Sequence, residues 1–230
     1  MQPRTNRTLA DLPLVRFENL SKSPGIIHFL TTRKGGVSEG DYASLNLALH
    51  VSDNPEKVLA NRRKVAAQTG MSLEHSVYLR QVHGGNVVTV HEHDRGRGAG
   101  DYEDGLEGDA MVTNIPGIVL NVQVADCLPV LFSARDGSTV AAAHAGWRGL
   151  AAGVLEATVA AMQVPPDEVI VWLGAAIGPD AFEVGAEVRD TFIASHPSAG
   201  TAFKPYRQRW LADIYTLARI RLNACGVRAI

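Results

Sequence analysis

The middle of the chain contains the stretch Ile118-Val-Leu-Asn-Val-Gln-Val124, and its pattern sets the secondary structure expected around it. Apolar residues at positions 120, 122 and 124 alternate with Asn121 and Gln123. A period of two residues predicts a strand with one apolar face. Further strands are expected over Val130–Ser133 and Thr139–Ala143, on either side of an Arg-Asp-Gly-Ser turn. Because these strands follow one another directly, the sequence favours an α+β fold over a doubly wound parallel sheet.

Strands and helices are also expected on both sides of this middle region. Asp53 or Asn54 can cap a helix that has Pro55 in its first turn and ends at Gly70. Further strands are expected over Ile26–Leu30, Val77–Val82, Val87–His91 and Val169–Leu173. Further helices are expected over Gly149–Met162, Val184–Ala194 and Trp210–Ala224. Gly226 is expected to close the last of these helices.

The 230 residues are enough for one large domain or two small ones, and no linker divides them. We therefore expect a flexible N-terminal extension over residues 1–23 and a single catalytic domain over residues 24–230. The charged, glycine-rich segment Glu92–Gly108 is expected to form a mobile surface loop rather than a domain boundary.

The composition is that of an ordinary soluble globular protein. Lys and Arg total 22 against 24 Asp and Glu, and the net charge of −2 argues against nucleic acid or an anionic membrane as partner. No apolar run approaches the roughly 18 residues that a membrane span needs, and the first 17 residues lack the apolar core of a secretory signal. Two cysteines cannot form a disulfide framework, so we expect a cytoplasmic protein.

Three short segments carry the most unusual chemistry in this sequence. They are Gln81-Val82-His83-Gly84, Ala125-Asp126-Cys127-Leu128-Pro129 and His144-Ala145-Gly146-Trp147-Arg148-Gly149. Each is expected at the end of a strand, where side chains from separate strands can converge on one cleft. His83, Cys127 and His144 would offer two imidazoles and one thiolate there. Three protein ligands with one open position are typical of catalytic zinc sites.

Spacing alone leaves other interpretations of these residues open. The separations match no compact zinc-finger signature, and a free cysteine is often a small buried residue beside hydrogen-bonded histidines. In a third interpretation Cys127 is a nucleophile that His83 or His144 activates, with Asp126 or Gln81 orienting the base. Because the zinc site and the nucleophile use the same residues, the sequence pattern does not separate them.

Many motifs along the chain occur in the same order as in one bacterial family. The N-terminal ones are Thr31-Thr-Arg-Lys-Gly-Gly-Val-Ser38, Ser44-Leu-Asn-Leu47, Asp53-Asn-Pro55 and Asn61-Arg62. The later ones are the three segments above, Gly108-Asp109-Ala110, Ile177-Gly-Pro179 and Phe182-Glu-Val-Gly185. On these residues the chain resembles the YfiH family, also called the laccase-domain or purine nucleoside phosphorylase family, from about Thr31 to Gly185.

The resemblance implies a fold, a metal site and an activity. The family fold is a four-layer α-β-β-α sandwich, related to that of cytotoxic-necrotizing-factor-like cysteine hydrolases. Members bind zinc through a His, a Cys and a His, which correspond here to His83, Cys127 and His144. The implied activities are phosphorolysis of adenosine, inosine and methylthioadenosine, and deamination of adenosine. Members have also been called polyphenol oxidases, and one branch is linked to peptidoglycan editing.

A laccase mechanism does not fit this sequence. A multicopper oxidase needs several His-x-His pairs and a blue-copper cysteine flanked by histidines. Among the eight histidines only His91-Glu92-His93 has that spacing, and it is expected on a solvated surface. Zinc, which the resemblance implies, is the expected cofactor, although Cu²⁺ can displace zinc at a site of two histidines and one cysteine.

The predicted partners are a small-molecule nucleoside and phosphate. Arg33 and Arg148 could bind phosphate through their guanidinium groups, although each could equally form an ion pair. Asn46 could hydrogen-bond the ribose or the base, or merely close a turn, and Gln81 is the fourth candidate for binding substrate. In deamination, Asp126 would shuttle a proton for a zinc-bound water that attacks purine C6. The alternative function is a peptidoglycan-editing amidohydrolase that acts on a UDP-muramyl amino-acid precursor in the same pocket.

Two departures from the family pattern bear on these expectations. Members usually continue past a segment like Gly226-Val227 into a strand region rich in Cys-Thr and Phe-Ser-Tyr-Arg sequences. The C-terminal end at Ile230 is therefore expected to be incomplete. Asp180 stands where many members carry Cys after Gly-Pro.

Overall fold

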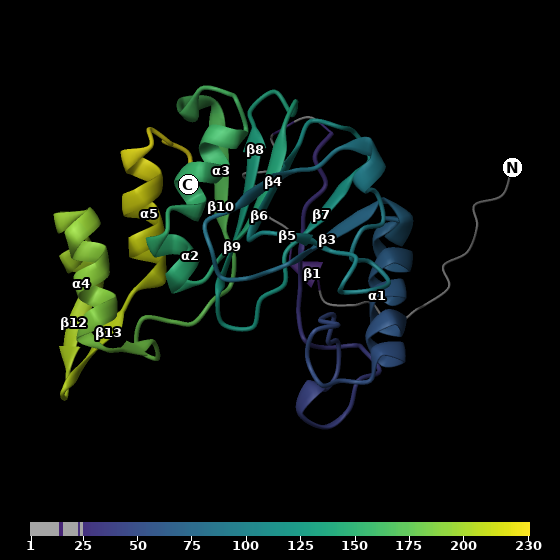
Figure 1. Cartoon of the computed structure of the whole chain (residues 1–230), viewed down its shortest axis with the longest axis horizontal. Helices are drawn as coiled ribbons and strands as arrows, with labels where there is room; N and C mark the ends of the chain where they lie inside the picture. Colours follow the sequence, from purple (N-terminus) through teal and green to yellow (C-terminus); the bar gives the residue numbers. More distant parts are fainter. Residues whose placement is uncertain (1–13, 16–22, 24) are drawn as a thin grey trace, which may run out of the picture.

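In the computed structural model, which describes residues 14–15, 23 and 25–230, a five-stranded sheet lies at the centre of the fold (Figure 1). Its strands are β4 Val87–Thr89, β6 Ala110–Thr113, β8 Leu128–Ala134, β9 Val140–Ala145 and β10 Val169–Leu173. Their order is β10-β8-β9-β6-β4, and every pair is antiparallel except β4 with β6. The extension expected over residues 1–23 lies almost wholly outside the described residues.

A smaller parallel sheet packs against one face of this central sheet. It consists of β5 Leu106–Glu107, β3 Ser76–Arg80 and β7 Val119–Asn121, in that order. Val77 and Leu79 of β3 form a buried cluster with Met111 of β6, so this cluster lies between the two sheets. Ala110 and Val112, which flank Met111 on β6, belong to the main core on the other face.

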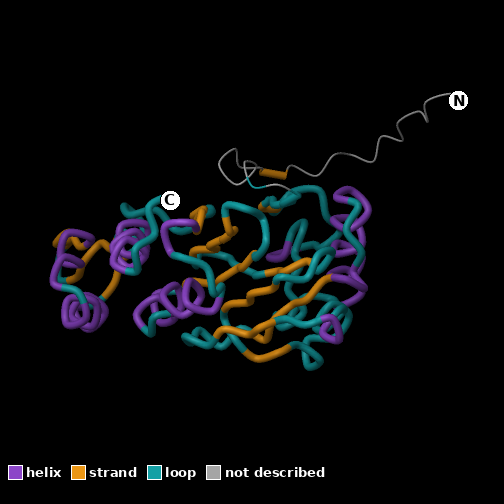
Figure 2. Tube along the Cα trace, turned by 90° about the horizontal axis from the view of Figure 1, so that it is seen from above, coloured by secondary structure: helices purple, strands orange, loops and turns teal. Residues whose placement is uncertain are grey.

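Helices cover the outer faces of both sheets. The main core joins the central sheet to α2 Trp147–Ala151, α3 Val154–Ala161 and α5 Ile214–Ala224. On the opposite side α1 Pro55–Thr69 lies over the smaller sheet, where Arg62 stacks on the Tyr78 ring of β3 at 3.8 Å. The layers run helix, sheet, sheet, helix (Figure 2), which confirms the expected α+β fold of the α-β-β-α type. Within the described ranges, no helix is long and apolar enough to cross a bilayer.

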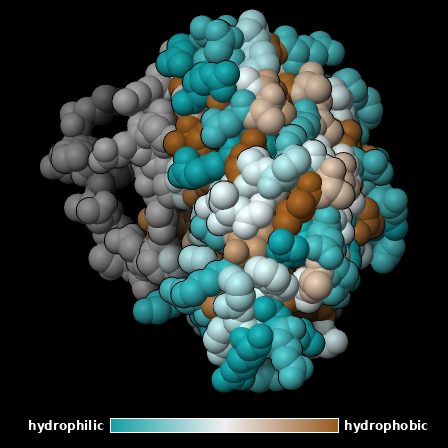
Figure 3. Space-filling model, turned by 90° about the vertical axis from the view of Figure 1, so that its left-hand side faces the viewer, coloured by the Kyte–Doolittle hydropathy of each residue, from teal (hydrophilic) through white to brown (hydrophobic). Residues whose placement is uncertain are grey.

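A third sheet lies beyond α5, at the left of Figure 1. It contains β11 Glu183–Val184, β13 Arg209–Ala212 and β12 Phe203–Tyr206, with α4 Ala186–Ser195 packed beside it. Figure 3 looks onto this end of the molecule and shows apolar residues scattered among polar ones. None of the predicted site residues lies in this unit, which shares the main core with α5 and contacts α2 through α4.

The single helix expected over Gly149–Met162 is wrong, because two helices occupy this region. Gly153 has a φ of +90°, a left-handed conformation that ends α2 and begins α3. The helix expected to start at Asp53 or Asn54 and to end at Gly70 is confirmed as α1, together with both of its ends. Asn54 caps α1 by accepting a hydrogen bond from the backbone N–H of Glu56, and Gly70 closes it with a φ of +72°.

The helix expected over Trp210–Ala224 is too long, because its first residues pair with β12 as β13. The helix begins only at Ile214, where the structure has a clear cap. The side chain of Asp213 accepts hydrogen bonds from the backbone N–H groups of Tyr215 and Thr216. A short apolar run is compatible with either a strand or a helix, so the sequence pattern could not locate this boundary.

Two expected strands are shorter among the described residues. Of Ile26–Leu30 only Leu30 is in a strand, β2 Leu30–Thr31, which pairs with β1 Leu14–Val15. Of residues 118–124 only β7 pairs, because the backbone of Gln123 bonds to the side chain of Gln81 instead of to a strand. Strands β3, β4, β8, β9 and β10 confirm the remaining expectations within a few residues.

The segment Glu92–Gly108 is not simply a surface loop. Its residues Asp94, Gly98 and Ala99 are buried. Arg62 of α1 donates hydrogen bonds to the carbonyls of Gly98 and Ala99, at 2.7 and 2.9 Å. The expectation of an excursion over the surface is therefore wrong for this part of the segment, because a buried guanidinium ties it to the body of the protein.

Candidate metal centre

The three predicted metal ligands lie together where β8 begins and β9 ends. The ligand atoms of His83, Cys127 and His144 are all within 4.8 Å of one another. His144 is buried, Cys127 is partly exposed and His83 is exposed, so the group opens to solvent on one side. The two imidazole rings meet edge to face, with centroids 4.8 Å apart. Two imidazole nitrogens and a thiolate form a donor set that suits zinc or copper.

Cys127 and His144 are brought together by the pairing of β8 with β9. Leu128 pairs with Ala145, and Pro129 pairs with His144. Cys127 directly precedes β8 and therefore lies beside the end of β9, although 17 residues separate it from His144 in sequence. An antiparallel hairpin thus fixes two of the three ligands through its register.

His83 reaches the cluster from a loop rather than from the central sheet. It follows β3, and its φ of +60° is in the left-handed region, which is uncommon for a residue other than glycine. Gly146 faces this loop from the end of β9. A Cβ atom at Gly146 would lie 2.9 Å from Cys127 Sγ and 3.3 Å from His83 Cδ2. The loop and the hairpin can therefore approach one another because Gly146 has no side chain.

Asp109 is fully buried and binds both histidine segments. Its Oδ1 accepts hydrogen bonds from His144 Nδ1 at 2.8 Å and from the backbone N–H of His83 at 2.9 Å. Its Oδ2 accepts from the backbone N–H groups of Gly84 at 2.6 Å and of Val82 at 3.2 Å. An ionised carboxylate can only accept hydrogen bonds, so His144 Nδ1 carries the proton and Nε2 is left for the cluster.

Sequence reasoning missed Asp109 as a functional residue. Gly108-Asp109-Ala110 contributes to the family resemblance, but the motif alone indicates no role for its carboxylate. The available signal is an acidic residue directly before the buried strand Ala110–Thr113. A carboxylate at such a position requires hydrogen-bond partners, and those partners prove to be the ligand-bearing segments.

Electrostatic interactions distinguish the two histidines. Burial lowers the pKa of His144, but its hydrogen bonds with Asp109 and Cys127 outweigh burial and raise that pKa to about 9. The pKa of His83 is lowered, first by partial desolvation and then by the positive charge of His144, with Arg148 contributing. Burial also raises the pKa of the Asp109 carboxyl, but the hydrogen bonds that it accepts lower the pKa further. Asp109 is therefore held in its ionised form.

Two other predicted site residues flank the cluster. Asp126 precedes Cys127, its side chain is exposed, and its backbone carbonyl accepts a hydrogen bond from the N–H of Ile177. Arg148 is exposed in α2, and its guanidinium carbon lies 4.7 Å from the centre of the Trp147 ring. Both charged groups are open to solvent, and their roles in proton transfer and phosphate binding stay predictions.

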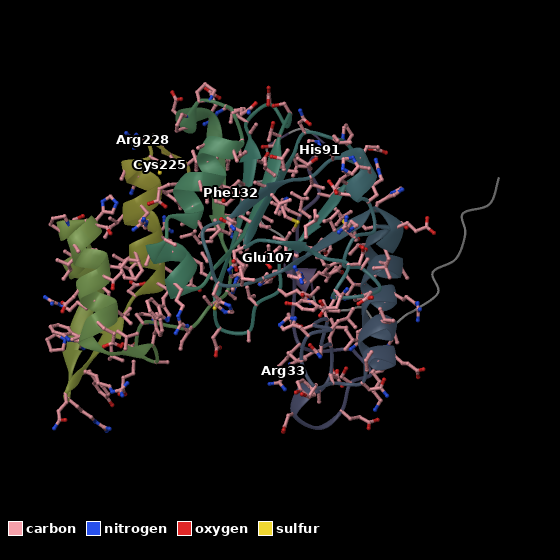
Figure 4. The ribbon with its side chains drawn as sticks, in the orientation of Figure 1. Arg33, His91, Glu107, Phe132, Cys225 and Arg228 are labelled. Carbon is pink, nitrogen blue, oxygen red and sulfur yellow. The ribbon has the colours of Figure 1, made fainter. Side chains whose placement is uncertain are left out.

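Arg33 and Asn46 are engaged in hydrogen bonds within the N-terminal loop. Arg33 Nε and Nη2 both donate to the carbonyl of Ala43, at 3.1 and 2.6 Å, in the loop at the bottom of Figure 4. The Asn46 amide donates to Asp53 Oδ2 at 3.0 Å and accepts from the N–H of Ala48 at 3.0 Å. This geometry favours the turn-closing role for Asn46, and binding of substrate by either residue stays a prediction.

Gln81 joins two segments that lead to the ligand cluster. Its amide donates to the backbone carbonyl of Gln123 at 2.8 Å and accepts from the Gln123 N–H at 2.7 Å. The side chain of Gln123 in turn donates to the carbonyl of Leu47 at 2.6 Å. Gln81 therefore has a clear structural role, and its predicted role in binding substrate is not tested by these contacts.

The sequence His91-Glu92-His93 lies on the surface, as expected. All three residues are exposed, and the rings of His91 and His93 stack with centroids 5.6 Å apart. Figure 4 places His91 at the upper right and Cys225 at the upper left, where the Cys225 thiol donates to the carbonyl of Arg221. Among the described residues, the cluster above is the one group of three or more candidate metal ligands.

Comparison with known proteins agrees with the sequence motifs. A purine nucleoside phosphorylase of Pseudomonas aeruginosa is 53% identical over 203 residues, which cover 87% of this chain and 78% of that protein. YfiH of Escherichia coli, also named a purine nucleoside phosphorylase, is 48% identical over 206 residues, which cover 90% of this chain and 81% of the relative.

A solved structure and a family model also match this chain. The crystal structure of YlmD from Geobacillus stearothermophilus matches with a TM-score of 0.86 at 35% identity, over 90% of this chain and 79% of that one. Residues 27–230 match the family described as multi-copper polyphenol oxidoreductase laccase. The chain therefore belongs to this laccase-domain family, together with the YfiH and YlmD proteins.

Proposed function

We propose that this chain is a zinc-dependent purine nucleoside phosphorylase that acts on adenosine, inosine and methylthioadenosine. Relatives up to 53% identical over most of the chain are named purine nucleoside phosphorylases. The observation that carries the proposal is the cluster of His83, Cys127 and His144, which is open to solvent on the His83 side. Three protein ligands beside an open position are typical of a catalytic rather than a structural metal site.

The residues of the cluster fit a zinc ion. Asp109 Oδ1 accepts a hydrogen bond from His144 Nδ1 and so fixes the tautomer of His144. This carboxylate–histidine arrangement is common around zinc. No described side chain supplies a fourth ligand within the group, so a substrate or phosphate oxygen could take that place. When bound, zinc would supply a Lewis acid that polarises such an oxygen.

Phosphorolysis breaks the C1′–N9 bond of the nucleoside and forms a bond between C1′ and a phosphate oxygen. The electron pair of the broken bond leaves with the purine, which takes up a proton. Arg148, an exposed cation whose charge reaches His83, would hold the phosphate through its guanidinium. Asp126, the exposed carboxylate next to Cys127, would pass to the departing purine the proton that the attacking phosphate gives up.

The direct test is turnover by metal-quantified protein with and without phosphate. Adenosine should yield adenine and ribose 1-phosphate only when phosphate is present, as separated by chromatography. Inosine formed without phosphate would demonstrate deamination instead. A free amino acid released from a UDP-muramyl conjugate, with adenosine left intact, would contradict the proposal in favour of the peptidoglycan-editing function.

Two cysteine variants link this activity to the cluster. Cys127→Ala should lose both the bound metal and the turnover of adenosine, because it removes the thiolate ligand. Cys225→Ala is the matched control, since that thiol lies near Arg221 at the end of α5, outside the cluster. An active Cys127→Ala protein that contains no metal would contradict the zinc-dependent mechanism.

A further inference from the structure

A cavity of about 400 Å³ lies outside the ligand cluster, and the function proposed above assigns nothing to it. Its volume is in the range of small-molecule sites, about 300–1,000 Å³. The side chains that line it belong to Leu49, His50, Pro55, Asp101, Tyr102 and Glu103. Two segments that are far apart in the sequence, 49–55 and 100–103, therefore form its two walls.

Arg62 fixes both walls from the interior of the protein. It is 1% exposed, and its Nε donates to the carbonyl of Leu47 at 2.8 Å, next to the first wall. Its Nη1 donates to the carbonyls of Gly98 and Ala99, next to the second wall. The guanidinium also stacks on the ring of Tyr78. The spacing of the walls is thus set by a buried charge with several partners.

A hydrogen-bonded chain connects the first wall to both sides of the cluster. Gln123 Nε2 donates to the carbonyl of Leu47 at 2.6 Å, and Gln123 lies four residues before Cys127. The backbone of Gln123 is bonded to Gln81, which lies two residues before His83. The cavity is therefore attached to the same segments that carry the ligands.

Aromatic rings from the two walls meet at the cavity. The His50 and Tyr102 rings lie 5.1 Å apart with an angle of 35° between their planes. The pKa of His50 is lowered by partial desolvation, by the charge of Arg62, and by the charges of His144 and His83. The His50 and Tyr102 rings therefore offer a flat aromatic surface in the cavity.

The charged groups at the cavity are acidic. Asp101 and Glu103 are exposed carboxylates, and the Glu103 contact with Arg80, at 3.5 Å, is on the surface. Carboxylates repel phosphate but accept hydrogen bonds from N–H and O–H groups. The cavity thus suits a neutral aromatic ligand that carries such donors, whereas the exposed cation Arg148 suits the anion.

We propose that this cavity binds the purine and ribose of the nucleoside, with the purine against the His50–Tyr102 pair. The carboxylates of Asp101 and Glu103 accept hydrogen bonds from the amino or hydroxyl groups of this ligand. Phosphate binds separately, on the Arg148 side of the cluster. This assignment rests on the nucleoside phosphorylase function proposed above, and it adds the location and the residues that select the base.

The test compares Tyr102→Ala and Tyr102→Phe with the wild-type protein. Adenine is titrated into each protein by calorimetry, and KM is measured for adenosine and for phosphate. Tyr102→Ala should raise the adenine Kd and the adenosine KM by about 5- to 150-fold, the usual loss when an aromatic stacking partner of a base is removed. Tyr102→Phe keeps the ring and should stay within about twofold of wild type. KM for phosphate should not change in either variant.

The matched control is Tyr206→Ala, which also removes a tyrosine ring. Tyr206 lies in β12, at the left end of Figure 1 and far from the cavity. Its adenine Kd and adenosine KM should equal those of the wild type. Thermal melting of all variants separates a loss of binding from a loss of folding. If Tyr102→Ala unfolds, His50→Ala replaces it and should raise the same two constants.

The outcomes separate this inference from the proposed function. If the wild type cleaves adenosine but Tyr102→Ala has unchanged constants for adenine and adenosine, the cavity assignment is wrong and the function stands. If the wild type binds adenine through Tyr102 but has no phosphorolytic activity, the cavity assignment stands and the function is wrong. A wild type that does not bind adenine overturns the cavity assignment.

Discussion

The two histidines of the cluster are the same residue type in opposite environments. His144 lies in a paired strand, is 2% exposed, and has its Nδ1 fixed by Asp109. His83 lies in a loop, is exposed, and has a ring without a hydrogen bond to the described residues. The protein thus fixes one ligand through its side chain and the other only through its backbone, with Asp109 as the shared anchor.

This difference shows how a rigid sheet can position a ligand on a neighbouring loop. Asp109 accepts three backbone N–H groups from residues 82–84, which shapes the loop, and a fourth hydrogen bond from His144. The buried side fixes the geometry of the cluster, and the exposed side is open to solvent. Variants that act on one side and not on the other test this division.

The largest expected effect comes from Asp109→Ala, which removes the hydrogen bonds to His144 and to the loop at residues 82–84 together. Four hydrogen-bond donors would lose their acceptor at a fully buried position. The free energy of unfolding should fall by about 3–5 kcal/mol, as when one partner of a buried charge pair is removed. Urea denaturation of metal-free protein measures this loss. Glu107→Ala is the control, because Glu107 is exposed in β5 and its removal should cost less than about 0.5 kcal/mol.

A smaller effect distinguishes the two histidines directly. His144→Ala should lower the free energy of unfolding of the metal-free protein by about 1–3 kcal/mol, because it removes a buried partner of Asp109. His83→Ala should change it by less than about 0.5 kcal/mol, because the exposed ring makes no such bond. Both variants should lose metal affinity. Equal stability losses for the two variants would contradict the division between a buried and an exposed side.

The smallest effect is expected at the contact between loop and hairpin. Gly146 has a φ of −65°, so the backbone accepts Ala, but the new Cβ would press on Cys127 Sγ and His83 Cδ2. Gly146→Ala should weaken zinc binding by about fivefold, the equivalent of about 1 kcal/mol of overpacking. Competition with a chromophoric chelator measures the affinity. Unchanged zinc affinity would show that close approach at Gly146 does not set the ligand positions.

The sequence predicts most strongly those elements whose signals are local. Asn54 and Gly70 mark the ends of α1, and the apolar run Val169–Leu173 is a strand with the expected bounds. The grouping of His83, Cys127 and His144 is also predicted, chiefly through motifs that resemble the YfiH family, and the structure brings these residues together. Spacing alone left the metal site, an inert cysteine and a nucleophilic cysteine open, because the approach of Cys127 to His144 depends on strand register.

What the sequence could not supply depends on contacts between distant residues. The contacts of Asp109 depend on the loop at residues 82–84, which lies 25 to 27 residues earlier in the chain. The cavity depends on Arg62 of α1, which hydrogen-bonds Leu47 in the loop before α1 and Ala99, 37 residues after Arg62 in the chain. The break at Gly153 is a local feature, but a glycine within an Ala-rich pattern does not by itself reveal its left-handed backbone.

X-ray absorption spectroscopy of the zinc-loaded protein tests the metal site most directly. The first shell should contain two nitrogen ligands at about 2.0–2.1 Å and one sulfur at about 2.3 Å, with a further light atom at the open position. In Cys127→Ser the sulfur contribution should disappear, whereas in Cys225→Ser it should remain. A shell without sulfur in the wild type, or one that keeps sulfur in Cys127→Ser, would contradict a site built from His83, Cys127 and His144.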